Sequence, residues 1–195
     1  MGDLIEYHSP REREEFTAYV GMLVFLGSWA MLFCGLFMAY GLLRSRSHLW
    51  PPAFQPAPPL GAGALITLLL LASSGLLQSG LRAVREGAGK RATQRVALAT
   101  ALGAAFSVGQ VAIGVGLHRQ GLTLNSSPFG SIYYGLTFIH LLHVAVGLVA
   151  LGWLTVRVSR GLVNPARHLA LRLWAMYWHF VGVVWLVMYV AVFVL

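Results

Sequence analysis

Five long apolar runs, separated by short polar connections, account for most of the chain. Each run lacks Asp, Glu, Lys and Arg, and the runs occupy residues 17–43, 60–81, 96–117, 131–156 and 173–195. A helix needs about 20 apolar residues to cross about 30 Å of hydrocarbon, and a backbone in hydrocarbon must satisfy its own hydrogen bonds. The period-two alternation typical of a membrane β-barrel is absent from these runs. The pattern therefore predicts an all-α integral membrane protein, a bundle of five transmembrane helices.

The segment before the first run differs from the rest of the chain. Residues 1–16 are polar and carry charges of both signs. The first apolar run is longer than the core of a secretory signal peptide, which has about 7–15 residues. We therefore expect the first helix to stay in the mature protein, with 1–16 as a cytoplasmic N-terminal segment and 17–195 as one membrane domain.

The basic residues predict how the helices are oriented. Eleven of the fourteen Lys and Arg residues lie in the N-terminal segment and in the second and fourth connections, on one side of the membrane. Only Arg44, Arg46 and Arg119 lie on the other side. Because basic loops stay in the cytoplasm, the N-terminus is expected there and the C-terminus outside, in the periplasm of a bacterium.

Composition excludes several classes of protein. Hydrophobic residues make up 57% of the chain and charged residues 10%, against about 25% charged residues in soluble domains. The net charge of +8 does not indicate nucleic-acid binding, since the basic residues are scattered among short loops. Cys34 is the only cysteine, so no disulfide and no cysteine-based metal site can form within the chain. No charged residue lies in any span, which disfavours ion-coupled transporters, pumps and small-solute carriers.

Polar side chains within or beside the spans are the candidates for specific contacts. In hydrocarbon a polar side chain is costly unless it is hydrogen-bonded, and bonds between neighbouring helices are the usual solution. We expect such interhelical contacts from Ser73, Ser74, Gln78, Gln110, His140, His143, Tyr177, Trp178 and His179.

The histidines also allow a functional interpretation, namely that they bind haem. His140 and His143 are three residues apart and share one helix face, and either could ligate a haem together with His179. A haem between two helices needs both ligands at similar depth, yet His143 and His179 differ in depth by about 9 Å at 1.5 Å per residue. Buried, hydrogen-bonded histidines are therefore favoured, and a haem-b membrane anchor that carries electrons is kept as the alternative.

Aromatic residues lie near the expected membrane surfaces. Trp50 precedes Pro51 and Pro52 in the longest connection, and Trp174 follows Arg172 at the start of the last helix. Tryptophan at the interface usually anchors a helix among the lipid headgroups. The alternative for Arg172 and Trp174 is a pocket for a lipid headgroup.

The order of these motifs resembles subunit III of the haem–copper respiratory oxidases, in its short five-helix bacterial form. The resemblance covers nearly the whole chain, and its most specific part is the run Tyr177-Trp178-His179-Phe180-Val181 with Val183-Val184-Trp185-Leu186. The other matching motifs are Gly21-Met22 through Phe33, Gly35-Leu36-Phe37 and Ala39-Tyr40 ending at Trp50-Pro51-Pro52, Leu70-Leu71-Ala72-Ser73-Ser74, Leu102-Gly103 through Phe106 and Gln110, Phe129-Gly130-Ser131 with Tyr134, and His140-x-x-His143-Val144-x-x-Gly147.

The chain departs from this family at positions that are usually acidic. Those positions hold Trp29, Ile113, Arg172 and Gly182 here. Roles that the family's carboxylates have in proton uptake and in shaping a lipid site cannot be carried over to these residues.

The resemblance implies a non-catalytic accessory subunit of a terminal oxidase that reduces oxygen to water. Such a chain carries no cofactor of its own, because haem and copper reside in the catalytic partners. Its expected partners are oxidase subunits I and II and phospholipids, and its expected location is the bacterial inner membrane. The electron donor, cytochrome c or quinol, is left open, and the subunit-III-like partner of a nitric oxide reductase is a related alternative.

Overall fold

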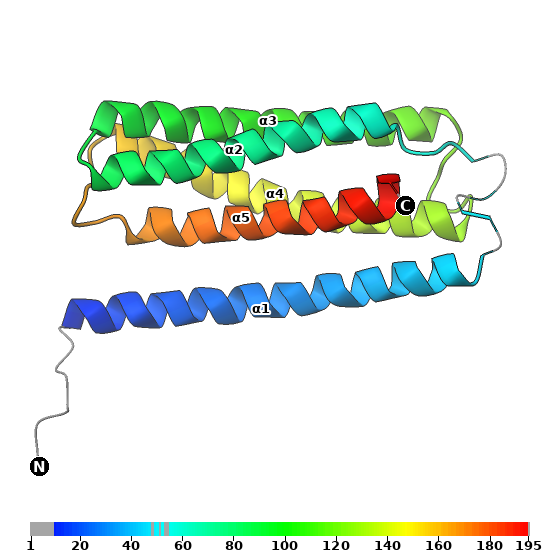
Figure 1. Ribbon diagram of the computed structural model, residues 1–195, viewed down its shortest axis with the longest axis horizontal. Helices are drawn as coiled ribbons and strands as arrows, with labels where there is room; N and C mark the ends of the chain where they lie inside the picture. Colours follow the sequence, from blue (N-terminus) through cyan, green and yellow to red (C-terminus); the bar gives the residue numbers. More distant parts are fainter. Residues whose placement is uncertain (1–9, 48, 51, 53–54, 195) are drawn as a thin grey trace, which may run out of the picture.

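The computed structural model of the protein describes residues 10–47, 49–50, 52 and 55–194. It contains five long helices and a final π-helical turn (Figure 1). These are α1 (Pro10–Ser45), α2 (Leu60–Arg85), α3 (Gly89–Arg119), α4 (Pro128–Ser159), α5 (Leu169–Tyr189) and η1 (Val190–Val194). All five helices are long and apolar enough to cross a membrane. The predicted all-α fold with five such helices is confirmed.

The helices extend beyond the charge-free runs that predicted them. Helix α1 begins at Pro10, so residues 10–16 of the expected N-terminal segment continue the first helix without a break. Charged residues limit a membrane span, but Glu and Arg are good helix formers, and proline suits the first turn of a helix. The division into a cytoplasmic segment and a membrane domain stays a prediction.

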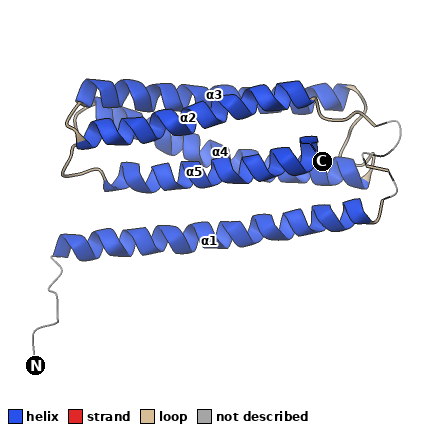
Figure 2. Cartoon of the chain, in the orientation of Figure 1, coloured by secondary structure: helices blue, strands red, loops and turns tan. Residues whose placement is uncertain are grey.

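Local sequence explains where several helices start and stop. The Ser127 side chain caps α4 by accepting a hydrogen bond from the backbone N–H of Gly130, and Pro128 occupies the first turn. Gly87, Gly121 and Gly161 follow α2, α3 and α4 and have positive φ values. Glycine adopts this conformation without the strain that a Cβ would cause. Each of these glycines therefore ends its helix in a turn, and the chain then reverses direction through a short connection (Figure 2).

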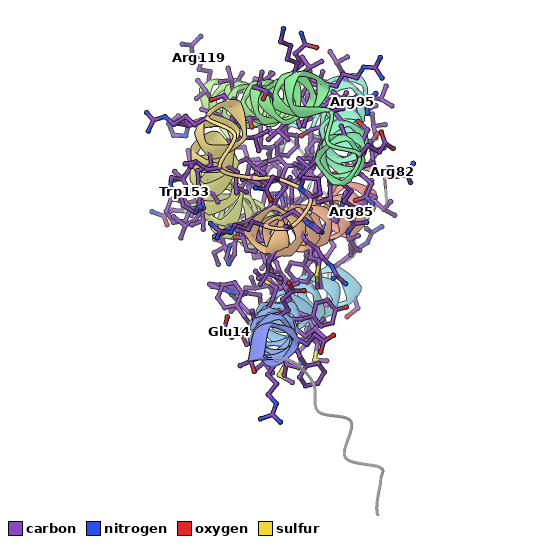
Figure 3. All side chains as sticks on the ribbon, turned by 90° about the vertical axis from the view of Figure 1, so that its left-hand side faces the viewer. Glu14, Arg82, Arg85, Arg95, Arg119 and Trp153 are labelled. Carbon is purple, nitrogen blue, oxygen red and sulfur yellow. The ribbon has the colours of Figure 1, made fainter. Side chains whose placement is uncertain are left out.

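Helices α2–α5 form a compact bundle, whereas α1 lies along one side of it (Figures 1 and 3). The bundle core is rich in aromatic residues, including Trp178, Trp185 and Phe106, which are fully buried. Helix α1 contributes three buried residues spaced by seven, Leu26, Phe33 and Tyr40. Helix α1 therefore contacts the bundle along a single narrow face, and most of its surface points away from the bundle.

The basic residues separate between the two ends of the bundle. The alternating helix directions bring the ends of α2 and α4 to the same end as the starts of α1, α3 and α5 (Figure 1). Arg82, Arg85 and Arg95 lie at this end, which faces the viewer in Figure 3. The described arginines at the opposite end are Arg44, Arg46 and Arg119. The uneven distribution of basic residues expected from the sequence is therefore present between the two ends of the bundle. The orientation of these ends in a membrane stays a prediction.

Candidate functional site

Trp178 lies at the point where the four helices of the bundle meet. Its indole N–H donates to Ser73 Oγ of α2 at 3.1 Å, and that hydroxyl donates to the carbonyl oxygen of Ala99 in α3 at 2.7 Å. The indole ring occupies space left by two glycines: a Cβ on Gly103 or Gly147 would lie 2.6 or 2.8 Å from it. Small residues allow helices to approach closely. One side chain of α5 therefore connects α2, α3 and α4.

Trp185 makes a second contact of the same kind, two turns further along α5. Its indole N–H donates to Thr67 Oγ1 of α2 at 2.9 Å, and Thr67 donates to the carbonyl oxygen of Gly63 at 2.7 Å. The sequence pattern alone does not predict this pair. A partial signal is present in the sequence, because Trp178 and Trp185 are seven residues apart, a spacing that places both indoles on one face of α5.

His143 lies at the contact between α4 and α1. Its Nδ1 donates to the carbonyl oxygen of Ile139 in its own helix at 2.6 Å, and its backbone carbonyl accepts from Tyr177 Oη at 3.0 Å. The imidazole ring meets the edges of two α1 rings, with centroid distances of 3.8 Å to Trp29 and 5.3 Å to Phe33. Because Nδ1 carries the proton, Nε2 is left as an acceptor, and none of the described residues bonds to it.

The other two histidines have different neighbours. His140 is fully buried beside Trp185, with ring centroids 5.4 Å apart. His179 Nε2 lies 3.4 Å from Gln78 Oε1 of α2. The structure therefore directs the His143 ring toward α1 and the His179 ring toward α2, and does not bring the two rings together as haem ligands. Within the described ranges, no group of three or more His, Cys, Asp and Glu residues could hold a metal ion.

Gln110 and Ser74 were also expected to join helices. Gln110 is 1% exposed, and its amide finds no hydrogen-bond partner among the residues that the structure describes. Ser74 is half-buried on α2 and faces α5, where its Oγ lies 3.6 Å from where a Cβ on Gly182 would be. Within the described residues, both side chains lie at helix contacts without a direct hydrogen bond to the neighbouring helix.

The four positions at which the family resemblance leads one to expect acids have different surroundings in the structure. Trp29 lies against His143, and Gly182 lies beside Ser74. Ile113 lines a groove between α2 and α3, and the Arg172 guanidinium lies over the Tyr19 ring of α1 at 5.4 Å. Aromatic, apolar or basic groups occupy these sites, so the described spans contain no acidic group here.

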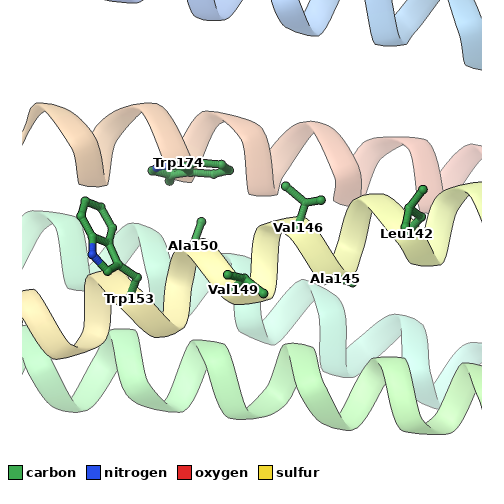
Figure 4. A pocket seen from close by; sticks show the side chains of 7 residues that line it. All are labelled: Leu142, Ala145, Val146, Val149, Ala150, Trp153 and Trp174. Atoms are coloured by element: carbon green, nitrogen blue, oxygen red, sulfur yellow. The ribbon is translucent and has the colours of Figure 1, made fainter.

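An apolar groove of about 700 Å³ runs along α4 and α5 (Figure 4). Its lining residues are Leu142, Ala145, Val146, Val149, Ala150, Trp153 and Trp174. At one end of the groove the Arg157 guanidinium lies over the Trp153 ring, 4.6 Å from its centroid. The groove therefore combines a long apolar wall with a cation at its end. Trp174 is the lipid or interface residue expected from the sequence, whereas Trp153 and Arg157 join this site only in the folded structure.

Trp50 lies at the opposite end of the molecule from this groove. Its indole N–H donates to Tyr40 Oη at 3.0 Å, and that hydroxyl donates to the carbonyl oxygen of Ala191 in η1 at 2.6 Å. The ring also meets Phe129 edge to face at 5.2 Å. Trp50 therefore ties the first connection to the ends of α1 and α5, and its place among lipid headgroups stays a prediction.

Comparison with known proteins identifies relatives over the whole length of the chain. The family model for cytochrome c oxidase subunit III matches residues 6–195. Cytochrome c oxidase subunit 3 of Thermostichus vulcanus is 31% identical over 196 residues, which cover all of this chain and 95% of that protein. The protein described as probable cytochrome c oxidase subunit 3 of Mycobacterium bovis is 34% identical, over 89% of this chain and 86% of its own length. The corresponding subunit of Corynebacterium diphtheriae is 32% identical over the same shares.

Proposed function

The chain belongs to the cytochrome c oxidase subunit III family, and from this membership we propose that it stabilises the catalytic subunit of its oxidase and holds phospholipid. It is a multi-pass membrane protein of the respiratory chain, a subunit III whose partners by family are the other subunits of an aerobic terminal oxidase. Members of this family generally carry no redox cofactor. The proposed location is the bacterial inner membrane, with the N-terminus in the cytoplasm.

The groove along α4 and α5 is the observation that carries the lipid proposal. Its wall of aliphatic side chains and Trp174 suits an acyl chain. Arg157 and Trp153 at its end suit the phosphate and glycerol of a headgroup, because arginine pairs with phosphate and tryptophan favours the interface. Arg157 lies in the last turn of α4 and is one of the basic residues whose distribution predicts the cytoplasmic side. The proposed ligand is thus an anionic phospholipid of the inner leaflet.

The apolar surface of α1 supports the stabilising role. Met31 and Met38 are more than three-quarters exposed, and Phe16 is 69% exposed. Lipid can cover this surface, and so can the membrane face of a larger subunit. Since the relatives are named as subunits of cytochrome c oxidases, we propose cytochrome c as the electron donor of the assembled complex.

The lipid proposal is tested by native mass spectrometry of the oxidase purified in a mild detergent. The double variant Trp153→Ala, Arg157→Gln is expected to lose anionic phospholipid that the wild-type complex retains. Arg160→Gln is the matched control, because Arg160 is an exposed arginine one turn further along. Equal lipid retention in the double variant and in the wild type would contradict the proposal.

The stabilising role needs a separate kinetic test. Oxidase depleted of this chain is expected to reduce oxygen normally in the first turnovers and then to lose activity faster than the complete complex. Failure of oxygen reduction in the very first turnover would show that the chain does more than stabilise.

A further inference from the structure

Three polar side chains in the bundle interior make no hydrogen bond to any part of the chain that the structure describes. Gln110 of α3 and Tyr133 and His140 of α4 are each at most 1% exposed. The unpartnered atoms are both amide atoms of Gln110, the Tyr133 hydroxyl and both ring nitrogens of His140. Folded proteins seldom leave such groups without a partner, because an unmade buried hydrogen bond is costly. These five atoms therefore call for a partner other than the protein.

The three residues form one polar column. Tyr133, Thr137 and His140 are spaced by four and three residues, so they share a face of α4. The Tyr133 hydroxyl lies close to the side chains of Gln110 and Thr137. The helices thus present four polar side chains to the same part of the interior.

Aromatic rings enclose this column. The centroids of Phe106 and Trp185 lie 6.2 and 5.4 Å from that of His140, and Phe193 lies 6.4 Å from Tyr133. The column lies within runs that hold no Asp, Glu, Lys or Arg, so the column offers no countercharge to an ion. The described residues also contain no group of three or more metal-ligating side chains. The chemistry of the column therefore suits a small neutral molecule that both donates and accepts hydrogen bonds.

We propose that ordered water molecules occupy this column and bind to Gln110, Tyr133, Thr137 and His140. Water can donate to the amide oxygen of Gln110 and accept from its amide nitrogen, and it can do the same for the two nitrogens of a neutral histidine. A buried water typically makes two to four such bonds, and the column supplies enough polar atoms for this. Gln110 then joins α3 to α4 through water rather than directly.

A groove between α3 and α4 lies beside this column. It has a volume of about 300 Å³, and both Gln110 and Thr137 line it. His118, one residue before the end of α3, lines the same groove. This hydration site is independent of the proposed lipid groove and of the stabilising role.

Radiolytic footprinting of the intact oxidase complex tests the proposal, because hydroxyl radicals formed from bound water oxidise the side chains beside it. Tyr133 and Tyr177 are a matched pair: both are 1% exposed, but Tyr177 is bonded to the carbonyl oxygen of His143. Tyr133 is expected to be oxidised several-fold faster than Tyr177 and, in ¹⁸O-labelled water, to incorporate the label. Equal rates for the two tyrosines would overturn the proposal.

A substitution at Gln110 gives a second, independent readout. With water in the column, Gln110→Met removes water ligands, so Tyr133 oxidation slows and the melting temperature of the subunit within the complex falls. If the column holds no water, the same substitution only removes an unpartnered amide. The melting temperature then rises and Tyr133 oxidation is unchanged, and this result would refute the proposed hydration site. Gln78→Met is the control, because Gln78 contacts His179 of α5 and lies outside the column; it is expected to leave Tyr133 oxidation unchanged.

Discussion

Helices α1 and α5 are both apolar membrane-type helices, yet they are held in opposite ways. Half of the most apolar stretch of α5 is buried inside the protein, but only 6% of the corresponding stretch of α1. Helix α5 lies in the bundle through Trp178 and Trp185, whose N–H groups bond to α2. Helix α1 touches α4 and α5 mainly through the ends of large side chains such as Trp29 and Phe33. Hydropathy therefore determines that a helix enters the membrane, while small residues and paired polar groups determine how closely it packs.

The largest expected effect comes from filling the space that Trp178 occupies. Gly103→Val would place a branched side chain where even a Cβ lies 2.6 Å from the indole ring. We expect a loss of about 3 kcal/mol in the free energy of unfolding, since overpacking a tight core forces backbone shifts. Chemical unfolding of the detergent-purified chain measures this loss. Gly35→Val on α1 is the matched control, because nothing lies within 4 Å of a Cβ there; a similar loss in both variants would erase the contrast between the two regions.

Trp178→Phe should produce the next largest effect. It removes the bond to Ser73 and leaves a cavity among four helices, so we expect a loss of about 2–3 kcal/mol in unfolding free energy. Trp29→Phe in α1 is the same substitution at a half-buried tryptophan, and it should lower the free energy of unfolding by less than about 1 kcal/mol. Ser73→Ala combined with Trp178→Phe should be less than additive, and full additivity would argue against a shared contact.

A smaller effect is expected where α1 is bonded to the end of α5. Tyr40→Phe removes the hydroxyl that links Trp50 to the carbonyl oxygen of Ala191. We expect a loss of about 1 kcal/mol and faster amide exchange in the last turns of α1, measured by hydrogen–deuterium exchange. Tyr19→Phe removes a hydroxyl at the other end of α1 and serves as the control. Unchanged exchange near Tyr40 would mean that this bond does not hold the helix end.

The smallest effect is predicted at the start of α5. Arg172→Gln removes the cation above the Tyr19 ring, a contact of about 0.5–1 kcal/mol at an exposed site. Amide exchange should rise in the first turns of α1 and stay constant in α2 and α3. The exposed Arg160, changed to Gln, provides the reference. A rise in exchange throughout the bundle would show that α1 is more tightly coupled to the bundle than its burial indicates.

The sequence predicts the number of helices but not their packing. Charge-free runs located all five helices, because the cost of charge in hydrocarbon is a local property of each segment. The separate position of α1 could not be predicted, since its outward residues Met31 and Met38 are as apolar as a buried face would be. Tertiary geometry alone distinguishes these two situations.

The polar residues show the same limit. Ser73, Tyr177 and Trp178 were expected to contact other helices, and the structure gives each a bond to one. The Thr67–Trp185 bond was missed, and Gln110 lacks the direct partner expected for it. A sequence indicates that a polar group in hydrocarbon needs a partner, but the partner depends on helix rotation and depth.

The loose attachment of α1 has a consequence for biosynthesis. Helix α1 leaves the ribosome before α4 and α5, the helices it packs against. In the interval two of its hydroxyl groups are satisfied within the helix itself: Ser28 donates to the carbonyl oxygen of Phe25, and Ser45 to that of Leu42. Helix α1 can therefore remain in the bilayer before α4 and α5 are synthesised, and its packing against them completes the newly made subunit.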